Sequence, residues 1–294
     1  MIIVIMGPTA SGKSKLALET ALKLNGEIVS FDSMQVYRGL EIGTAQPTQE
    51  ERKAVPHHLV GICDLRQRLD VFTFTEWAEK AVNEILARNK VPILAGGTGL
   101  YLRSFLYGMD DMPGDRAVRA ELDQLYDAPE KEAALHARMA ETDPAALEKW
   151  GQCRRRLIRA LEVKLVSGKS ILELQQNLPR KMRGDVRAFK LELPPETLSL
   201  KIAARTEKML KDGWIEEAKL AIDNGLLETP TAHQALGYKI IASYLKGEMS
   251  KAELQEKLII ATRQYARRQR TWFRHQHPEA LPVTSPESPL PIAD

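Results

Sequence analysis

Gly7-Pro8-Thr9-Ala10-Ser11-Gly12-Lys13-Ser14 satisfies the phosphate-loop pattern GxxxxGKS/T. The apolar run Ile2–Met6 before it predicts a buried strand, and Lys13–Leu24 predicts an amphipathic helix. A second strand is expected at Glu27–Phe31, which completes the order of a parallel βαβ unit. The pattern binds phosphate in this context. It therefore predicts an enzyme whose substrate carries a di- or triphosphate.

The residue types of this P-loop suit an anionic ligand. Glycines let backbone N–H groups approach phosphate oxygens, and the following helix adds the positive end of its dipole. Lys13 supplies a point charge and Ser14 is a candidate ligand for Mg²⁺, the one cofactor that we expect. The diphosphate-binding residues are predicted to be Gly7, Pro8, Thr9, Ala10, Ser11, Gly12, Lys13 and Ser14.

A further βα unit follows the first one. Val71–Asn89 is expected to be helical, and Val91–Ala95 is a continuously apolar run typical of a strand buried on both faces. These units predict an α/β fold with a P-loop NTPase-like core, in which helices flank a parallel sheet. Because such sheets bind ligands beyond the carboxyl ends of their strands, Asp32 and Thr98 should lie near the P-loop.

The sequence changes character beyond Pro113. We expect a core domain formed by residues 1–114 and 185–277, an inserted helical subdomain at 115–184, and a flexible tail at 278–294, which contains five prolines. One more strand is expected at Val186–Leu193. Helices are predicted at Leu198–Lys211, Trp214–Asp223, Ala232–Leu245 and Lys251–His275.

Charge is unevenly distributed although the net charge is only +3. Asp110–Lys149 has eleven acidic residues against five basic ones, whereas Trp150–Lys190 has eleven basic residues against three acidic ones. Separate basic stretches in a near-neutral protein indicate a surface for a polyanion, although solvated helix faces are the alternative. One array is Arg154-Arg155-Arg156 with Arg159. The second recurs with helical spacing at Arg263, Arg267, Arg270 and Arg274.

Composition also indicates where the protein works. The two cysteines lack CxxC spacing, no apolar run approaches the ~20 residues of a membrane span, and the N-terminus lacks the pattern of a signal peptide. We therefore expect a cytoplasmic protein without a membrane partner.

From the residues alone, Asp32 could be a metal ligand, a general base or a helix N-cap. The apolar run Val91–Ala95 ends without a Walker-B aspartate, and no guanine-reading NKxD motif is present. Two alternatives stay open beside the interpretation that follows. One is a P-loop small-molecule kinase, and the other is a non-catalytic RNA-binding nucleotide switch. The loop itself leaves open whether ATP binds.

Several segments resemble the signatures of bacterial tRNA dimethylallyltransferases, also called tRNA isopentenyltransferases. The resemblance covers nearly the whole chain, and its strength lies in the number and order of short matches. They are Gly7–Ser14, Asp32–Pro47, Pro56–Leu59, Gly96–Tyr101, Arg159–Val163, Ala235–Lys239 and Ala261–Gln269.

The resemblance implies transfer of a dimethylallyl group from dimethylallyl diphosphate to N6 of adenosine 37 in tRNA. It implies that Asp32 is the base, that Thr98 lies near the diphosphate and the metal, and that Arg205 contacts the diphosphate. The expected partner is the tRNA anticodon stem-loop, and a monomer is expected. The expected tRNA-binding residues are Asp32, Ser33, Met34, Gln35, Thr98, Arg119, Arg155, Arg156, Leu157, Ile158, Arg159, Arg263, Arg267, Arg270 and Arg274.

For Gln35 and for three aromatic residues near the second basic array, a purely structural role is an alternative. Gln35 suits a bidentate contact with an adenine edge, but it could be an ordinary polar loop residue. Tyr265, Trp272 and Phe273 could stack on splayed bases, although core packing is the favoured interpretation of aromatic residues on a helix.

Overall fold

The computed structural model describes residues 1–109, 112–175, 181–277, 279–288 and 290–292. The chain divides into two compact units. The first comprises Met1–Tyr107 and Met182–Asp294, and the second comprises Gly108–Lys181. Each unit is described by itself.

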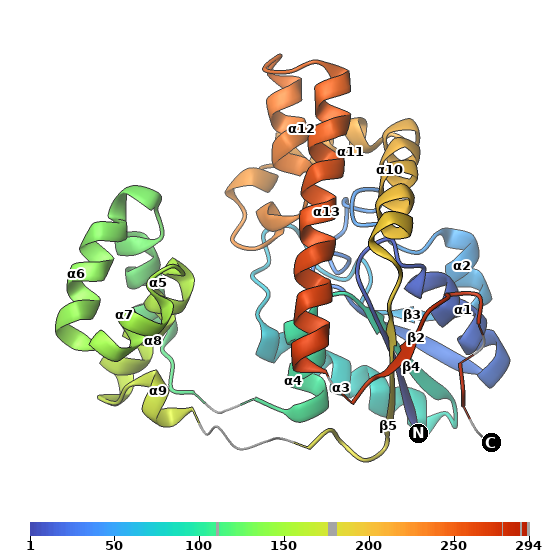
Figure 1. The fold of residues 1–294 in the computed structure, drawn as a ribbon, viewed down its shortest axis with the longest axis horizontal. Coiled ribbons are helices and arrows are strands. Elements are labelled where there is room, and N and C mark those ends of the chain that lie inside the picture. Colours follow the sequence, from blue (N-terminus) through green and yellow to red (C-terminus); the bar gives the residue numbers. More distant parts are fainter. Residues whose placement is uncertain (110–111, 176–180, 278, 289, 293–294) are drawn as a thin grey trace. The chain divides into compact units, whose positions relative to one another are not determined.

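The first unit is built on a six-stranded sheet in the order β3-β2-β4-β1-β5-β6, in which every neighbouring pair is parallel (Figure 1). This arrangement confirms the predicted α/β class with a parallel sheet. The strands are β1 (Ile2–Met6), β2 (Gly26–Phe31), β3 (His57–His58), β4 (Val91–Gly96), β5 (Val186–Leu191) and β6 (Leu281–Val283).

The strand register brings three loops to one edge of the sheet. Gly96, the last residue of β4, pairs with Met6 of β1 on one side and with Phe31 of β2 on the other. The P-loop, Asp32 and the segment from Gly97 therefore leave the sheet at the same level. This is the convergence that the sequence predicts for the carboxyl ends of parallel strands.

Helix α1 (Lys13–Leu24) packs on one face of this sheet and α3 (Val71–Ala87) on the other. The further helices of this unit are α2 (Gln49–Ala54), α4 (Gly99–Tyr107), α10 (Pro195–Lys211), α11 (Trp214–Asp223), α12 (Tyr238–Leu245) and α13 (Lys251–Gln276). Short 3₁₀ turns lie at Leu226–Glu228 and Ala232–Gln234. Side chains of β1 alternate between two cores: Val4 packs with α3 and α4, whereas Ile3 and Ile5 pack with α1. The long helix α13 packs against α10, α12 and α4 (Figure 1).

The second unit is entirely helical in its described residues. It consists of α5 (Arg116–Tyr126), a 3₁₀ turn (Pro129–Lys131), α6 (Glu132–Thr142), α7 (Pro144–Trp150), α8 (Arg154–Ser167) and α9 (Ile171–Leu174). Its own core includes Leu135, Met139, Leu157, Ile158 and Leu161, all at most 1% exposed. A separate core is what a compact folding unit requires.

Two expectations about elements need correction. The tail is wrong as a fully flexible segment, because Leu281–Val283 pairs with β5 and the side chains of Val283 and Leu290 are buried in the α1-side core. The single helix expected at Ala232–Leu245 is also wrong. Gly237 adopts φ 97°, so a 3₁₀ turn precedes it and α12 starts only at Tyr238.

Candidate active site

The P-loop adopts a backbone suited to binding an anion. Ala10 and Gly12 have left-handed φ angles of 63° and 92°. The Pro8 carbonyl accepts hydrogen bonds from Ser11 N–H and from Lys13 Nζ, each at 3.3 Å. Left-handed residues in such a loop turn backbone N–H groups toward a common centre, which suits the binding of an anion at the start of α1.

A cavity of about 560 Å³ opens beside this loop. Its cationic side chains are Lys13 from the P-loop and Lys201 and Arg205 from α10, with the hydroxyl of Ser14 beside Lys13, and Glu51 and His57 also line the cavity. The remaining wall includes the apolar side chains of Ala17, Leu18, Ile28, Pro47 and Ala95. The cavity can therefore hold a ligand with an anionic head and a small apolar group.

Two cations and one carboxylate interact at the entrance of the P-loop. Burial lowers the pKa of Lys13 to about 8, an effect that the Asp32 carboxylate opposes and the Arg205 guanidinium reinforces. Burial likewise lowers the pKa of Arg205, again opposed by Asp32. Arg205 Nη2 donates to the Thr9 hydroxyl at 2.6 Å. Among the described residues, Arg205 Nε is buried without a hydrogen-bond partner. Two half-buried cations beside one carboxylate leave an excess of positive charge that favours an anion.

Asp32, Ser33 and Thr98 meet as expected at the ends of β2 and β4. Asp32 Oδ1 accepts from Met34 N–H at 2.9 Å, so the carboxylate does stabilise its own turn. Thr98 Oγ1 accepts from Ser33 N–H at 3.0 Å and donates to Ser33 Oγ at 3.3 Å. Thr98 N–H in turn donates to the carbonyl of Phe31 at 3.1 Å. Thr98 therefore fixes the backbone next to Asp32, which places a carboxylate beside the two cations.

The amide of Gln35 is fully engaged within the chain. Its Oε1 accepts from Ser30 Oγ at 2.7 Å, and its Nε2 donates to the carbonyls of Thr44 and Ala45 at 3.1 and 2.8 Å. A contact with an adenine edge would require these bonds to be exchanged. Gln35 instead supports the loop that follows Asp32.

Glu217 on α11 supports the same loop and is not apparent from the sequence. Its carboxylate accepts from the N–H groups of Ile42 and Gly43 at 2.6 and 2.8 Å, and from Tyr238 Oη at 2.7 Å. Nothing in the local sequence around Glu217 distinguishes it from a solvated helix acid. The contact becomes visible only in the fold, which brings Glu217 next to Gly43 although the two residues are far apart in the sequence.

Helix α13 carries the second basic array. Arg263, Arg267 and Arg274 are exposed and Arg270 is half-buried, as a solvent-facing stripe requires. Gln269, whose importance the sequence does not signal, is 6% exposed. It accepts from Thr9 N–H at 2.8 Å and donates to the Gly97 carbonyl at 2.9 Å.

The aromatic residues of α13 divide between the core and the site. Phe273 is 1% exposed, and Trp272 packs against the same core, which agrees with the favoured interpretation for these two residues. Tyr265 is half-buried, and burial followed by the nearby Asp32 carboxylate raises the pKa of its hydroxyl. Tyr265 therefore faces the candidate site rather than the deep core.

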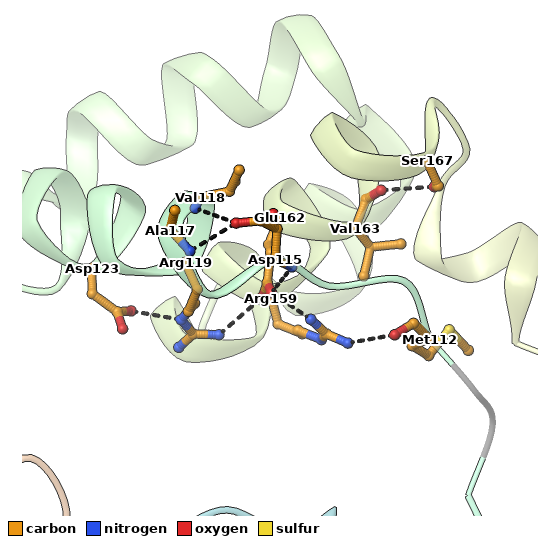
Figure 2. Close-up of polar contacts among 10 residues, drawn as sticks. All are labelled: Met112, Asp115, Ala117, Val118, Arg119, Asp123, Arg159, Glu162, Val163 and Ser167. Carbon is orange, nitrogen blue, oxygen red and sulfur yellow. Dashed lines mark hydrogen bonds and ion pairs between the residues drawn. The ribbon is translucent and has the colours of Figure 1, made fainter. Parts of the chain in front are cut away.

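In the helical unit, Arg119 and Arg159 converge on the buried carboxylate of Glu162 (Figure 2). Arg159 Nη1 lies 2.7 Å from Glu162 Oε1, and Arg119 Nη1 lies 3.5 Å from Oε2. Arg119 Nε also donates to Asp123 at 2.8 Å, and Arg159 Nη2 donates to the Met112 carbonyl at 3.1 Å. Both arginines thus have structural partners in this unit.

The segment of α8 that carries the first basic array contains both exposed and buried residues. Arg155 and Arg156 are exposed on α8. The expectation that Leu157 and Ile158 contact RNA is wrong for their side chains, because both are 0% exposed in the core of the helical unit. Leu157 and Ile158 pack with Leu135 and Met139 in that core, whereas the side chains of Arg155 and Arg156 are exposed to solvent.

The residues at the P-loop fit Mg²⁺ only if a bound phosphate ligand supplies further oxygens to the ion. The exposed hydroxyl of Ser14 lines the cavity beside Lys13. The described part of the chain contains no group of three or more His, Cys, Asp or Glu side chains that could hold a metal ion. Mg²⁺ commonly takes few protein ligands and completes its shell with water and phosphate oxygens. One hydroxyl beside an anion site suits that mode.

No helix in the described residues combines the length and apolar character that a membrane span requires.

Comparison with known proteins assigns the family. The profile of IPP transferase matches residues 35–276. A tRNA dimethylallyltransferase from Exiguobacterium sp. is 42% identical over 278 residues, which are 94% of this chain and 88% of that protein. One from Geobacillus thermodenitrificans is 40% identical over 290 residues, covering 97% of this chain and 91% of that protein.

Solved structures agree with the sequence relatives. The tRNA isopentenylpyrophosphate transferase of Bacillus halodurans superposes with a TM-score of 0.70 at 35% identity, covering 96% of this chain and 89% of that one. A eukaryotic dimethylallyltransferase acting on tRNA gives a TM-score of 0.77 at 28% identity, covering 92% and 69% of the two chains. The chain belongs to the IPP transferase family.

Proposed function

We propose that this protein transfers a dimethylallyl group from dimethylallyl diphosphate to N6 of adenosine 37 in tRNA. The observation that carries the proposal is family membership over nearly the whole chain, joined to a cavity with a cationic and an apolar side. Diphosphate suits the cationic side and a five-carbon group suits the apolar wall. Neither the kinase nor the nucleotide-switch alternative gains support from the relatives.

The leaving group accounts for the cations at the P-loop. As the bond between the allylic carbon and oxygen breaks, negative charge develops on the diphosphate. Lys13, Arg205 and the inward N–H groups of the loop stabilise this charge. Ser14 would hold Mg²⁺ beside the diphosphate, and the ion would supply further charge neutralisation when bound.

We assign Asp32 as the base that accepts the N6 proton. The N6 lone pair of adenine is delocalised into the ring, so its attack on the allylic carbon is assisted when the N6 proton moves to a carboxylate. The new carbon–nitrogen bond forms, diphosphate departs, and the proton ends on Asp32. Thr98 acts as a positioning residue, because its hydroxyl holds the backbone of Ser33 next to this carboxylate.

The RNA partner follows from the same proposal. N6 of a stacked adenosine is inaccessible, so the base must leave the stack and enter the site. We assign the anticodon stem-loop to the exposed arginines Arg263, Arg267 and Arg274 of α13 and to Arg155 and Arg156 of α8. We further propose that the protein acts as a monomer in the cytoplasm, where its tRNA substrate is found.

One assay tests the function. The protein is incubated with Mg²⁺, dimethylallyl diphosphate and unmodified tRNA, and the nucleosides are analysed by mass. We expect adenosine to gain one C5 prenyl group in the native protein and none with Asp32→Asn, which keeps the size of the side chain. Calorimetric titration with ATP tests the kinase alternative, which predicts tight ATP binding. Absence of the prenyl product while a known family member is active would refute the proposal.

A further inference from the structure

Gln269 joins two loops of the site that are far apart in sequence. Its Oε1 accepts from the N–H of Thr9 in the P-loop at 2.8 Å, and its Nε2 donates to the carbonyl of Gly97 at 2.9 Å. The first partner is a donor and the second an acceptor, so only one orientation of the amide satisfies both. With 6% of its surface exposed, Gln269 has no role as a solvated polar residue.

The packing around Gly97 shows that this bridge is built into the fold. A Cβ atom at residue 97 would collide with Gln269 Nε2, and one at residue 99 would collide with the ring of Trp272. Gln269 and Trp272 are three residues apart, so both side chains project from the same face of α13. The two glycines that flank Thr98 therefore let α13 approach this loop closely.

We propose that Gln269 is a positioning residue for the transfer reaction, which sets the distance between the P-loop and the Thr98 loop. On the P-loop side, Thr9 also receives the Arg205 hydrogen bond. On the other side, Thr98 holds the backbone beside Asp32. Through these contacts one amide aligns the diphosphate-binding loop with the base. This inference rests on the proposed function.

The chemistry of the amide suggests a sharp variant. In Gln269→Glu, a protonated carboxyl group is nearly isosteric with the amide and still offers one donor and one acceptor. The ionised carboxylate has no donor for the Gly97 carbonyl. Gln269→Met keeps the volume of the side chain but removes both hydrogen bonds at every pH. The exposed Gln264 on the same helix provides the matched control, Gln264→Glu.

The experiment compares kcat and the KM for tRNA of these variants with those of the native protein across the pH range that the enzyme tolerates. We expect Gln269→Met to lower kcat about tenfold or more at every pH, with little change in KM for tRNA. Gln269→Glu should show a similar loss at high pH, and its kcat relative to native should rise as pH falls. The other ionisable groups of the site are common to both proteins, so this ratio isolates residue 269.

Each outcome decides the proposal. Native kcat in both Gln269 variants would overturn it, and so would a pH-independent ratio for Gln269→Glu, because the donor to Gly97 would then be unimportant. If Gln269→Met fails to fold, the ratio for Gln269→Glu still decides. If the native protein itself transfers no prenyl group, the proposed function fails. Calorimetric titration with inorganic diphosphate then tests Gln269 alone: weaker binding by Gln269→Met than by Gln264→Glu supports the bridge, and equal binding overturns it.

Discussion

The guanidinium of Arg205 donates a hydrogen bond of 2.6 Å to the hydroxyl of Thr9, which ties α10 directly to the P-loop. Residues 196 positions apart in the chain thereby share one anion site. In a P-loop, the lysine and the helix dipole supply positive charge from the loop itself. Here a second cation reaches the same site from a helix beyond the inserted unit.

Arg205→Lys should weaken the use of dimethylallyl diphosphate while leaving tRNA affinity nearly unchanged. Lysine keeps the charge, but its single ammonium lacks the planar fork with which arginine donates to Thr9 through Nη2 and points its other nitrogens elsewhere. A hydrogen bond to a charged group contributes about 1.5–3 kcal/mol, so kcat/KM for the diphosphate substrate should fall by roughly ten- to a hundredfold. Steady-state kinetics at saturating tRNA measures this. Arg66→Lys, at an exposed position of the same unit, should change nothing.

Lys13 predicts a pH dependence of anion binding. Burial lowers its pKa to about 8, so in the free protein the ammonium loses its proton as pH rises through that value. Diphosphate binds the charged form, and its affinity should therefore fall above about pH 8, approaching tenfold per pH unit. Lys13→Arg stays protonated, so its affinity should lack this component. Calorimetry measures the affinity of both proteins for diphosphate across this pH range. Because the protonation of diphosphate itself is the same in both experiments, the difference between the two profiles reports on residue 13. Identical pH profiles would contradict the assignment.

The sequence predicts the parts of the site that depend on local pattern. Gly7–Ser14 has a backbone geometry that its own residues dictate, and the periodicity of Lys251–His275 marks a helix that the structure extends by one residue. Contacts made by tertiary packing were not predictable in this way. Gln269 lies 260 residues from Thr9, and nothing near it in the sequence specifies a loop as its partner.

Short strands are missed for a similar reason. The strand β3 has only two residues, both histidines, which show no alternating apolar pattern. The prolines around β6 argue against a strand in the sequence, because a proline cannot donate a ladder hydrogen bond. Pro282 is tolerated here because β6 lies at the edge of the sheet. Both strands are defined by their neighbours, β2 and β5, rather than by their own composition.

Variants of Glu162 and Arg156 should distinguish arginines with a structural role from arginines that bind RNA. Glu162→Gln removes the charge that Arg119 and Arg159 share, and the side chains of these two arginines are only 23% and 28% exposed. We expect a loss of about 2 kcal/mol in the stability of the helical unit, below the ~3–5 kcal/mol for a fully buried pair because water reaches both arginines. Reduced hydrogen-exchange protection of α5 and α8 measures this loss.

Arg156→Gln is the matched comparison, because Arg156 is exposed on the same helix. Hydrogen-exchange protection should stay native, whereas the salt dependence of tRNA binding should decrease. The slope of log K against log salt changes by about 0.7–0.9 for each phosphate that the protein no longer neutralises. Anisotropy of a labelled anticodon stem-loop at several salt concentrations gives this slope. An unchanged slope would place Arg156 away from the RNA.

Val283 tests whether the C-terminal segment is part of the folded core. Its side chain is 6% exposed beside Phe189 and Leu191 of β5, and the chain then leads to Pro286, which packs against Gly12 of the P-loop. Val283→Asp places a charge in this core and should destabilise the first unit by about 2 kcal/mol or more, seen as a lower urea midpoint. The adjacent Thr284 is exposed, so Thr284→Asp should leave the midpoint within about 0.5 kcal/mol of native. Equal midpoints for the two variants would show that β6 contributes nothing to the stability of the sheet.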